Sequence, residues 1–146
     1  MVIGIFGESC VGKSALAGRL KERLGAEVYS GKDFLRLAKN EAAAKAVFQE
    51  KLEEAVDGPH MIYVITEQEH LPLLPERAVR VLITASLETI KERFAQRLGG
   101  DLPAPVAGML ERKHGAFDGG SCDIHIVSEE ADLDEACEKV LRLVEA

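Results

Sequence analysis

The sequence lacks a basic excess, and this absence limits the partners that the protein can bind. Of its 146 residues, 25 are Asp or Glu and 18 are Lys or Arg, which gives a formal net charge of −7. Residues 120–146 carry eight acidic and two basic side chains, whereas residues 1–119 carry seventeen and sixteen and are almost neutral. Proteins that bind nucleic acids or anionic membranes through general electrostatics usually have a basic excess. We therefore expect no polymeric nucleic acid and no membrane as partner, and we expect any anion-binding site to be local.

Cysteine is scarce, and the three cysteines have no motif spacing. Cys10, Cys122 and Cys137 are odd in number and contain no C-x-x-C pair, so neither a disulfide framework nor a zinc ribbon is predicted. The histidines do not show H-x-x-x-H or another metal-binding spacing, so no zinc site is predicted from them. This cysteine usage is typical of a reducing compartment.

Long apolar runs are absent as well. The apolar start, Val2 to Phe6, is far too short for a signal-peptide core and has no basic region before it, so we expect a cytoplasmic location. The composition, 47% hydrophobic and 29% charged, is that of a soluble globular protein. The length is that of one ordinary domain, so a single domain over residues 1–146 is predicted.

Short apolar runs alternate with helical patterns along the whole chain. Strands are predicted at residues 2–6, 27–30, 61–66, 79–84 and 124–127. Helices are predicted at residues 14–24, about 33–56, 87–98, 106–114 and 133–144, with a loop or short helix at 71–76. Asn40 is a possible break in the second helix, and Ser86 is a plausible N-cap of the third. The alternation predicts an α/β fold, in which a five-stranded, mostly parallel sheet is covered by helices on both faces.

One motif in the sequence carries specific chemistry. The segment Gly7-Glu8-Ser9-Cys10-Val11-Gly12-Lys13-Ser14 fits the phosphate-binding loop pattern G-x-x-x-x-G-K-[ST]. It follows a predicted strand and opens a predicted helix, which is the arrangement that phosphate binding requires. We therefore predict the three-layer fold of P-loop NTPases, with all eight residues of this segment in contact with a bound nucleotide.

Each fixed position of that pattern has a physical role. Gly7 and Gly12 permit a close backbone approach, so that successive N–H groups can turn inward around a phosphate at the positive end of the following helix. Lys13 is expected to reach the β- and γ-phosphates, and the Ser14 hydroxyl to bind Mg²⁺. ATP and Mg²⁺ are the ligands that this motif predicts.

With this loop, the chain resembles the small P-loop kinases of the nucleoside monophosphate kinase group, such as adenylate and cytidylate kinases. The segment Ser30 to Arg36, S-G-K-D-F-L-R, is similar to the S-T-G-D-x-L-R segment of that family, with one residue displaced around Lys32. In that family the segment begins the acceptor site, so the resemblance implies that Arg36 grips the acceptor phosphate. A guanidinium can hold phosphate oxygens bidentately, although a solvated helix arginine would leave the same pattern.

Asp33 in the same segment supports more than one interpretation. A phosphate acceptor is already ionised and needs no strong base, whereas a hydroxyl acceptor needs a carboxylate to take its proton. Related P-loop kinases of small hydroxyl metabolites look similar and place an Asp after the second strand. Asp33 is therefore a candidate catalytic base, and a simple helix N-cap is equally compatible with the sequence.

Further arginines resemble the residues that line the family's lid, expected here at about residues 99–117. Arg93 and Arg97 are similar to the R-x-x-x-R element, and their spacing places them on one helical face, where both could contact the transferred phosphoryl group. Arg112 resembles the basic residue on the returning side of the lid, with its neighbour Lys113 as an equal competitor. Each of these arginines could instead be a surface charge paired with a nearby glutamate.

The sequence also departs from the family. The third predicted strand lacks the Asp that commonly ends it to anchor Mg²⁺, and Glu67, one position later, is a candidate substitute that would act through a water. The D-G-F-P-R sequence of adenylate kinases is replaced by T-E-Q-E-H at Thr66 to His70, so recognition of the acceptor base is not transferred.

Three functions follow as hypotheses. The resemblance favours an ATP- and Mg²⁺-dependent phosphotransferase of the nucleoside monophosphate kinase type. The alternatives are a kinase of a small hydroxyl metabolite, with Asp33 as base, and a non-catalytic ATP-binding regulatory protein. The first two require ATP and a small-molecule phosphoryl acceptor as partners.

Overall fold

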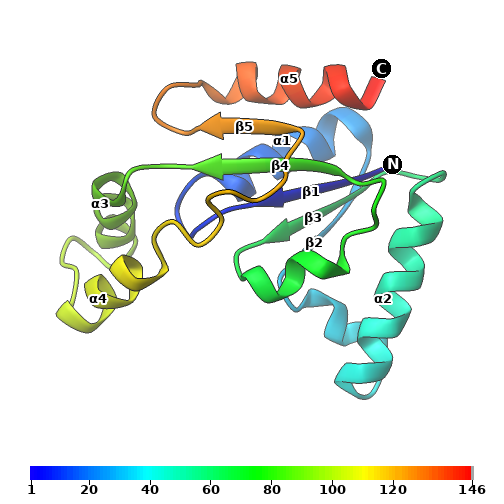
Figure 1. Cartoon of the computed structure of the whole chain (residues 1–146), viewed down its shortest axis with the longest axis horizontal. Coiled ribbons are helices and arrows are strands. Elements are labelled where there is room, and N and C mark those ends of the chain that lie inside the picture. Colours follow the sequence, from blue (N-terminus) through cyan, green and yellow to red (C-terminus); the bar gives the residue numbers. More distant parts are fainter. Residues whose placement is uncertain (146) are drawn as a thin grey trace.

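The computed structural model describes residues 1–145, and its centre is a parallel sheet (Figure 1). Within these residues five strands are hydrogen-bonded in the order β2-β3-β1-β4-β5, and all neighbouring pairs are parallel. The strands are β1 (Val2–Phe6), β2 (Glu27–Ser30), β3 (Met61–Ile65), β4 (Val79–Thr84) and β5 (Ile124–Val127). The predicted five-stranded sheet is thereby confirmed.

Helices cover both faces of the sheet. They are α1 (Lys13–Leu24), α2 (Glu41–Ala55), α3 (Leu87–Arg97), α4 (Ala104–Lys113) and α5 (Leu133–Glu145), with two 3₁₀ helices, η1 (Asp33–Leu37) and η2 (Gln68–Leu73). Alternate residues of β1 point to opposite faces, because Ile3 and Ile5 pack with α1 and α5, whereas Val2 and Phe6 pack with α2. The two apolar layers explain why every residue of β1 and β3 is buried.

The long helix predicted at about residues 33–56 is divided at Asn40. The Asn40 side chain accepts a hydrogen bond of 2.8 Å from the Ala43 N–H and so caps α2. The preceding residues form η1 instead. Ser86 caps α3 in the same way through the Thr89 N–H, as the sequence predicted.

The strand order brings several connecting segments together at the edge of the sheet where the carboxyl ends of the strands lie. Because β1 lies between β3 and β4, the segments that leave the carboxyl ends of these strands start side by side. Figure 1 shows α3 and α4 beyond the arrowheads of the strands, at this same edge. Among the described helices, none has the length and apolar character needed to cross a membrane.

Candidate active site

The loop from Gly7 to Ser14 leaves β1 and enters α1 at the centre of this edge. The Gly7 N–H donates to the Ile65 carbonyl at 3.2 Å, and a Cβ on Gly7 would lie 2.2 Å from the Ile83 carbonyl oxygen. The loop is thus wedged between the ends of β3 and β4, where no side chain fits. Gly12 has a φ of 105° and stands at the N-cap of α1. Cys10, with a φ of 65°, is the only residue other than glycine with positive φ in the part of the chain that the structure describes.

Lys13 is a buried cation at the start of α1. Its side chain is only 6% exposed, and its ammonium group donates to the backbone carbonyl oxygen of Glu8. Burial lowers the pKa of Lys13 from 10.5 to about 8, and the positive charge of Arg97 acts in the same direction. The neighbouring Cys10 thiol group and the negative charges of Glu8 and Glu67 act in the opposite direction on the pKa of Lys13. A buried ammonium group whose charged form is destabilised in this way is suited to bind an anionic ligand, because the ligand's negative charge would raise the pKa of Lys13 again.

Two cavities border both the loop and the first turn of α1. The larger, about 580 Å³, extends from the loop over α3 toward the start of α5, and is mostly apolar, with Ile83, Ile126 and Leu133 among its lining residues. The second, about 390 Å³, contains Lys13 and Ser14, together with residues that follow β2 and β3. Cys10, Gly12, Ala15 and Arg97 line both cavities. The pair therefore offers a mostly apolar compartment that adjoins a more polar one around Lys13.

The two arginines of α3 have different positions. One guanidinium nitrogen of Arg93 donates both to the Cys10 carbonyl and to the Ser128 hydroxyl, each at 2.9 Å. Arg93 thereby joins the loop to the end of β5. Arg97, one turn further, is exposed and lines both cavities around the loop. The structure thus brings both predicted arginines to the loop, with Arg93 bound to its backbone.

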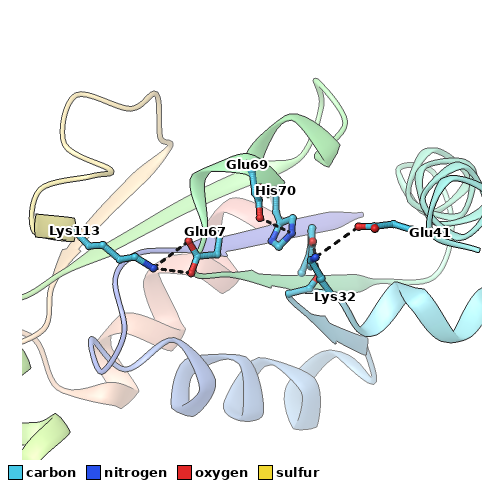
Figure 2. Close-up of polar contacts among 8 residues, drawn as sticks. Lys32, Glu41, Glu67, Glu69, His70 and Lys113 are labelled. Atoms are coloured by element: carbon cyan, nitrogen blue, oxygen red, sulfur yellow. Dashed lines mark hydrogen bonds and ion pairs between the residues drawn. The ribbon is translucent and has the colours of Figure 1, made fainter. Parts of the chain in front are cut away.

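A third cavity, of about 400 Å³, lies on the other side of the loop. Ser9 and Thr66 line it and also line the cavity around Lys13, so the two compartments adjoin at these residues. Its wall includes the predicted residues Glu67 and Arg112, and it includes Glu8. Figure 2 shows the ammonium group of Lys113 directed at the Glu67 carboxylate, at 3.2 Å.

The residues expected in the acceptor segment lie beside these cavities. One carboxylate oxygen of Asp33 accepts the Ser30 N–H at 2.9 Å, at the start of η1. The Arg36 guanidinium stacks over the Tyr29 ring, 4.5 Å from its centroid. Neither Asp33 nor Arg36 is among the described residues that line the three cavities. Asp33 is nevertheless only two residues from Gly31, which lines the cavity around Lys13.

Tyr63 ties this segment to the sheet. Its hydroxyl donates to the Gly31 carbonyl at 2.7 Å, from a fully buried ring. Burial raises the pKa of Tyr63, with a smaller contribution from the charge of Asp33. The hydroxyl is therefore a neutral donor that holds Gly31 beside the cavity.

The two predicted Mg²⁺ ligands fit unequally. The Ser14 side chain is exposed in the cavity around Lys13, and its hydroxyl oxygen is of the hard type that Mg²⁺ prefers. The Glu67 carboxylate is paired with Lys113 and lines the third cavity. No group of three His, Cys, Asp or Glu side chains in residues 1–145 is placed to hold a metal ion. Ser14 fits the role, and Glu67 stays a prediction.

Some residues of the site carried no usable signal in the sequence. His114 contacts Glu8 of the loop, from which it is separated by more than a hundred positions along the chain. Ser128 contacts the Arg93 side chain, which in turn binds the loop. Thr66 could have been found, because it directly follows β3, next to the end of the strand where the family usually has its Asp. It lines two of the three cavities.

No protein-family model matches the chain, and no curated protein matches it. Several solved structures do match the chain. A sugar kinase from Janibacter is 15% identical, with a TM-score of 0.68 over 99% of this chain and 94% of that one. A gluconokinase from Sinorhizobium meliloti is 16% identical, with a TM-score of 0.64 over 99% and 93%. Shikimate kinase from Aquifex aeolicus is 19% identical, with a TM-score of 0.56 over 99% and 96%.

These likenesses establish the fold, which is that of the small P-loop kinases, over nearly the full length of the chain. The three-layer P-loop fold predicted from the sequence is thereby confirmed. The narrower resemblance to nucleoside monophosphate kinases does not follow from them, because none of the three proteins is named as one.

Proposed function

We propose that the protein is an ATP-dependent kinase of a small molecule. The observation that carries the proposal is the burial of Lys13, whose ammonium faces a cavity bounded by the glycine loop, between an apolar cavity and a mixed polar one. This order of compartments matches a nucleoside, its phosphates and an acceptor. The kinase fold of the structural neighbours supports the same function.

The donor side has a place for each part of ATP. The apolar cavity of about 580 Å³ suits a purine and its ribose, and the adjoining cavity of about 390 Å³ suits the phosphates. The loop amides and the N-terminus of α1 would face these phosphates. Mg²⁺ held through Ser14 would neutralise phosphate charge.

Catalysis of phosphoryl transfer depends mainly on positioning and electrostatics. In our proposal Lys13 stabilises negative charge on the phosphate oxygens, and Arg97 contributes from the rim of both donor cavities. Arg93 keeps the loop in shape through the Cys10 carbonyl. The acceptor approaches from the third cavity, where Ser9 and Thr66 border the phosphate compartment.

Between the two acceptor classes, we propose a hydroxyl-bearing metabolite. Arg36, which the family resemblance assigned to an acceptor phosphate, is stacked on Tyr29 away from the lined cavities. Asp33, the candidate base, lies next to the residues that line the phosphate cavity. The names of the neighbours, a sugar kinase, a gluconokinase and a shikimate kinase, also favour this class. A nucleoside monophosphate stays the second candidate because the Ser30 to Arg36 segment resembles that family.

A coupled assay of ADP release tests this function. The protein would be incubated with ATP, Mg²⁺ and panels of hydroxyl metabolites and nucleoside monophosphates. We expect turnover with a hydroxyl acceptor and its loss in Lys13→Met, while Lys21→Ala, on the exposed side of the same helix, retains it. Rapid phosphorylation of a monophosphate would overturn the acceptor class. Tight ATP binding without any acceptor would indicate a non-catalytic ATP-binding protein.

A further inference from the structure

Glu8 is a loop residue whose side chain leaves the nucleotide site. Its carboxylate is only 10% exposed and contacts the segment that begins at the last residue of α4, here called the cover segment, residues 113–117. One carboxylate oxygen lies 3.0 Å from His114 Nδ1, and the other accepts the Gly115 N–H at 3.2 Å. A carboxylate with so little access to water depends on such partners for its stability.

The cover segment has further contacts with the ends of β1 and β3. The Lys113 ammonium pairs with Glu67, as Figure 2 shows, and the Gln68 side-chain amide donates to the Ala116 carbonyl. Phe117 is buried and its ring lies 5.8 Å from that of Phe6. Glu8 therefore supplies two of the polar contacts that dock this segment, and it is the member of the glycine loop that does so.

This docking builds one wall of the third cavity. Lys113, Ala116 and Phe117 line that cavity, and Glu8, which contacts His114 and Gly115, lines it as well. Glu8 is not among the described residues that line the two cavities around Lys13 and the apolar compartment. Its backbone carbonyl, in contrast, accepts the hydrogen bond from Lys13. The main chain of Glu8 thus belongs to the donor site, whereas its side chain holds the acceptor side.

We propose that Glu8 is a positioning residue for the acceptor, which holds the cover segment over the third cavity. The role of that cavity rests on the proposed function, but the docking itself does not. If the Glu8 carboxylate is removed, the cavity loses a fixed wall while the apolar and phosphate compartments keep all of their lining residues. Acceptor binding should therefore weaken more than nucleotide binding, which loses only the effect of the Glu8 charge on Lys13.

Hydrogen exchange of the backbone amides in residues 113–117 tests the docking directly. Glu8→Leu has a similar size but no acceptor, so we expect the Gly115 and Ala116 amides to exchange about tenfold faster. Glu8→Gln keeps an oxygen for the Gly115 N–H and a polar group for His114, so it should restore most of the protection. Glu69→Gln, a carboxylate change on the wall of the same cavity, should leave this exchange unchanged.

Binding of a fluorescent ATP analogue provides the second readout and verifies folding. We expect Glu8→Leu to bind the analogue with a far smaller loss of affinity than Lys13→Met, because it removes only the Glu8 charge near Lys13 and keeps the lining of both donor cavities. Should Glu8→Leu fail to fold, His114→Ala removes one contact from the cover side and should also accelerate exchange. Unchanged exchange in either variant, or a loss of nucleotide binding as large as that of Lys13→Met, would overturn the proposal.

The proposal and the proposed function can fail separately. If the acceptor screen identifies a substrate, Glu8→Leu should raise KM for that acceptor by a larger factor than KM for ATP. If the screen finds none, the exchange rates still decide whether Glu8 holds the cover segment. Faster exchange with an unchanged acceptor KM would contradict the positioning role while leaving the kinase function intact.

Discussion

The guanidinium of Arg93 lies 2.9 Å from the carbonyl oxygen of Cys10, the loop residue that adopts a positive φ without being glycine. Because a side chain at φ 65° is unfavourable, the loop needs contacts that hold it there. Arg93 provides one of them and is anchored in turn on Ser128.

Arg93→Ala should therefore damage both stability and nucleotide binding. We expect a loss of about 1–2 kcal/mol in the free energy of unfolding, since two partly buried hydrogen bonds disappear. Urea unfolding and titration with a fluorescent ATP analogue would measure these effects. Arg97→Ala is the matched control, because Arg97 is exposed at the rim of both donor cavities: it should weaken nucleotide binding and leave the unfolding midpoint unchanged.

The lowered pKa of Lys13 predicts two opposite pH dependences. Above pH 8 the free protein loses the ammonium proton, so the affinity for ATP should fall by up to about tenfold per pH unit. Binding near pH 8.5 should also take up protons, which calorimetry in buffers of different ionisation enthalpy detects. An affinity that stays constant from pH 7 to 9.5 would refute this prediction.

Stability should change in the other direction. The lowering from 10.5 to about 8 corresponds to about 3 kcal/mol of destabilisation, which applies fully below pH 8 and is relieved between pH 8 and 10.5. Lys13→Met should accordingly melt at a higher temperature than the natural sequence at pH 7. The difference in Tm should shrink by pH 9.5, and an equal difference at both pH values would contradict it.

Gly7 and Gly18 should respond oppositely to alanine. A methyl group on Gly7 would collide with the Ile83 carbonyl, so Gly7→Ala should cost about 2–3 kcal/mol and abolish ATP binding. A methyl group on Gly18, in the middle of α1, would meet open space, so Gly18→Ala should stabilise the protein by about 0.5–1 kcal/mol. Urea unfolding of both variants measures the contrast. A tolerated Gly7→Ala would show that the loop is less tightly wedged than the structure has it.

Asp33→Asn distinguishes a catalytic base from a residue that only accepts the Ser30 N–H; the N-cap of η1 is Lys32, so the helix N-cap that the sequence also allowed for Asp33 is not what the structure has. The amide oxygen of Asn can still accept the Ser30 N–H, so Tm should change little. If Asp33 takes the proton of a hydroxyl acceptor, kcat should fall by about 10²- to 10⁴-fold while KM for ATP is retained. An unaltered kcat would contradict the role of catalytic base and leave Asp33 with a structural role, the hydrogen bond from Ser30 at the start of η1.

Much of the fold could be predicted because it depends on local patterns. The apolar run Val2–Phe6, ended by Gly7, predicted β1. The predicted break at Asn40 and the predicted N-cap at Ser86 are the residues that cap α2 and α3. The final helix was equally clear from its apolar face, which packs on the sheet through Val140 and Leu141. The error at residues 33–56 was small, because the predicted break at Asn40 is where α2 begins and only the preceding turns form η1 instead of an α-helix.

The sequence by itself determined the fold class and the phosphate-binding loop, because strand alternation, helix capping and glycine freedom act within a few residues. Only the tertiary structure decided how far Lys13 is buried, that Arg93 binds the loop backbone, and that Arg36 stacks on Tyr29. It also decided that Glu8 reaches His114 across more than a hundred residues. Burial and charge pairing depend on which chain segments the strand order brings together, and no local spacing encodes that.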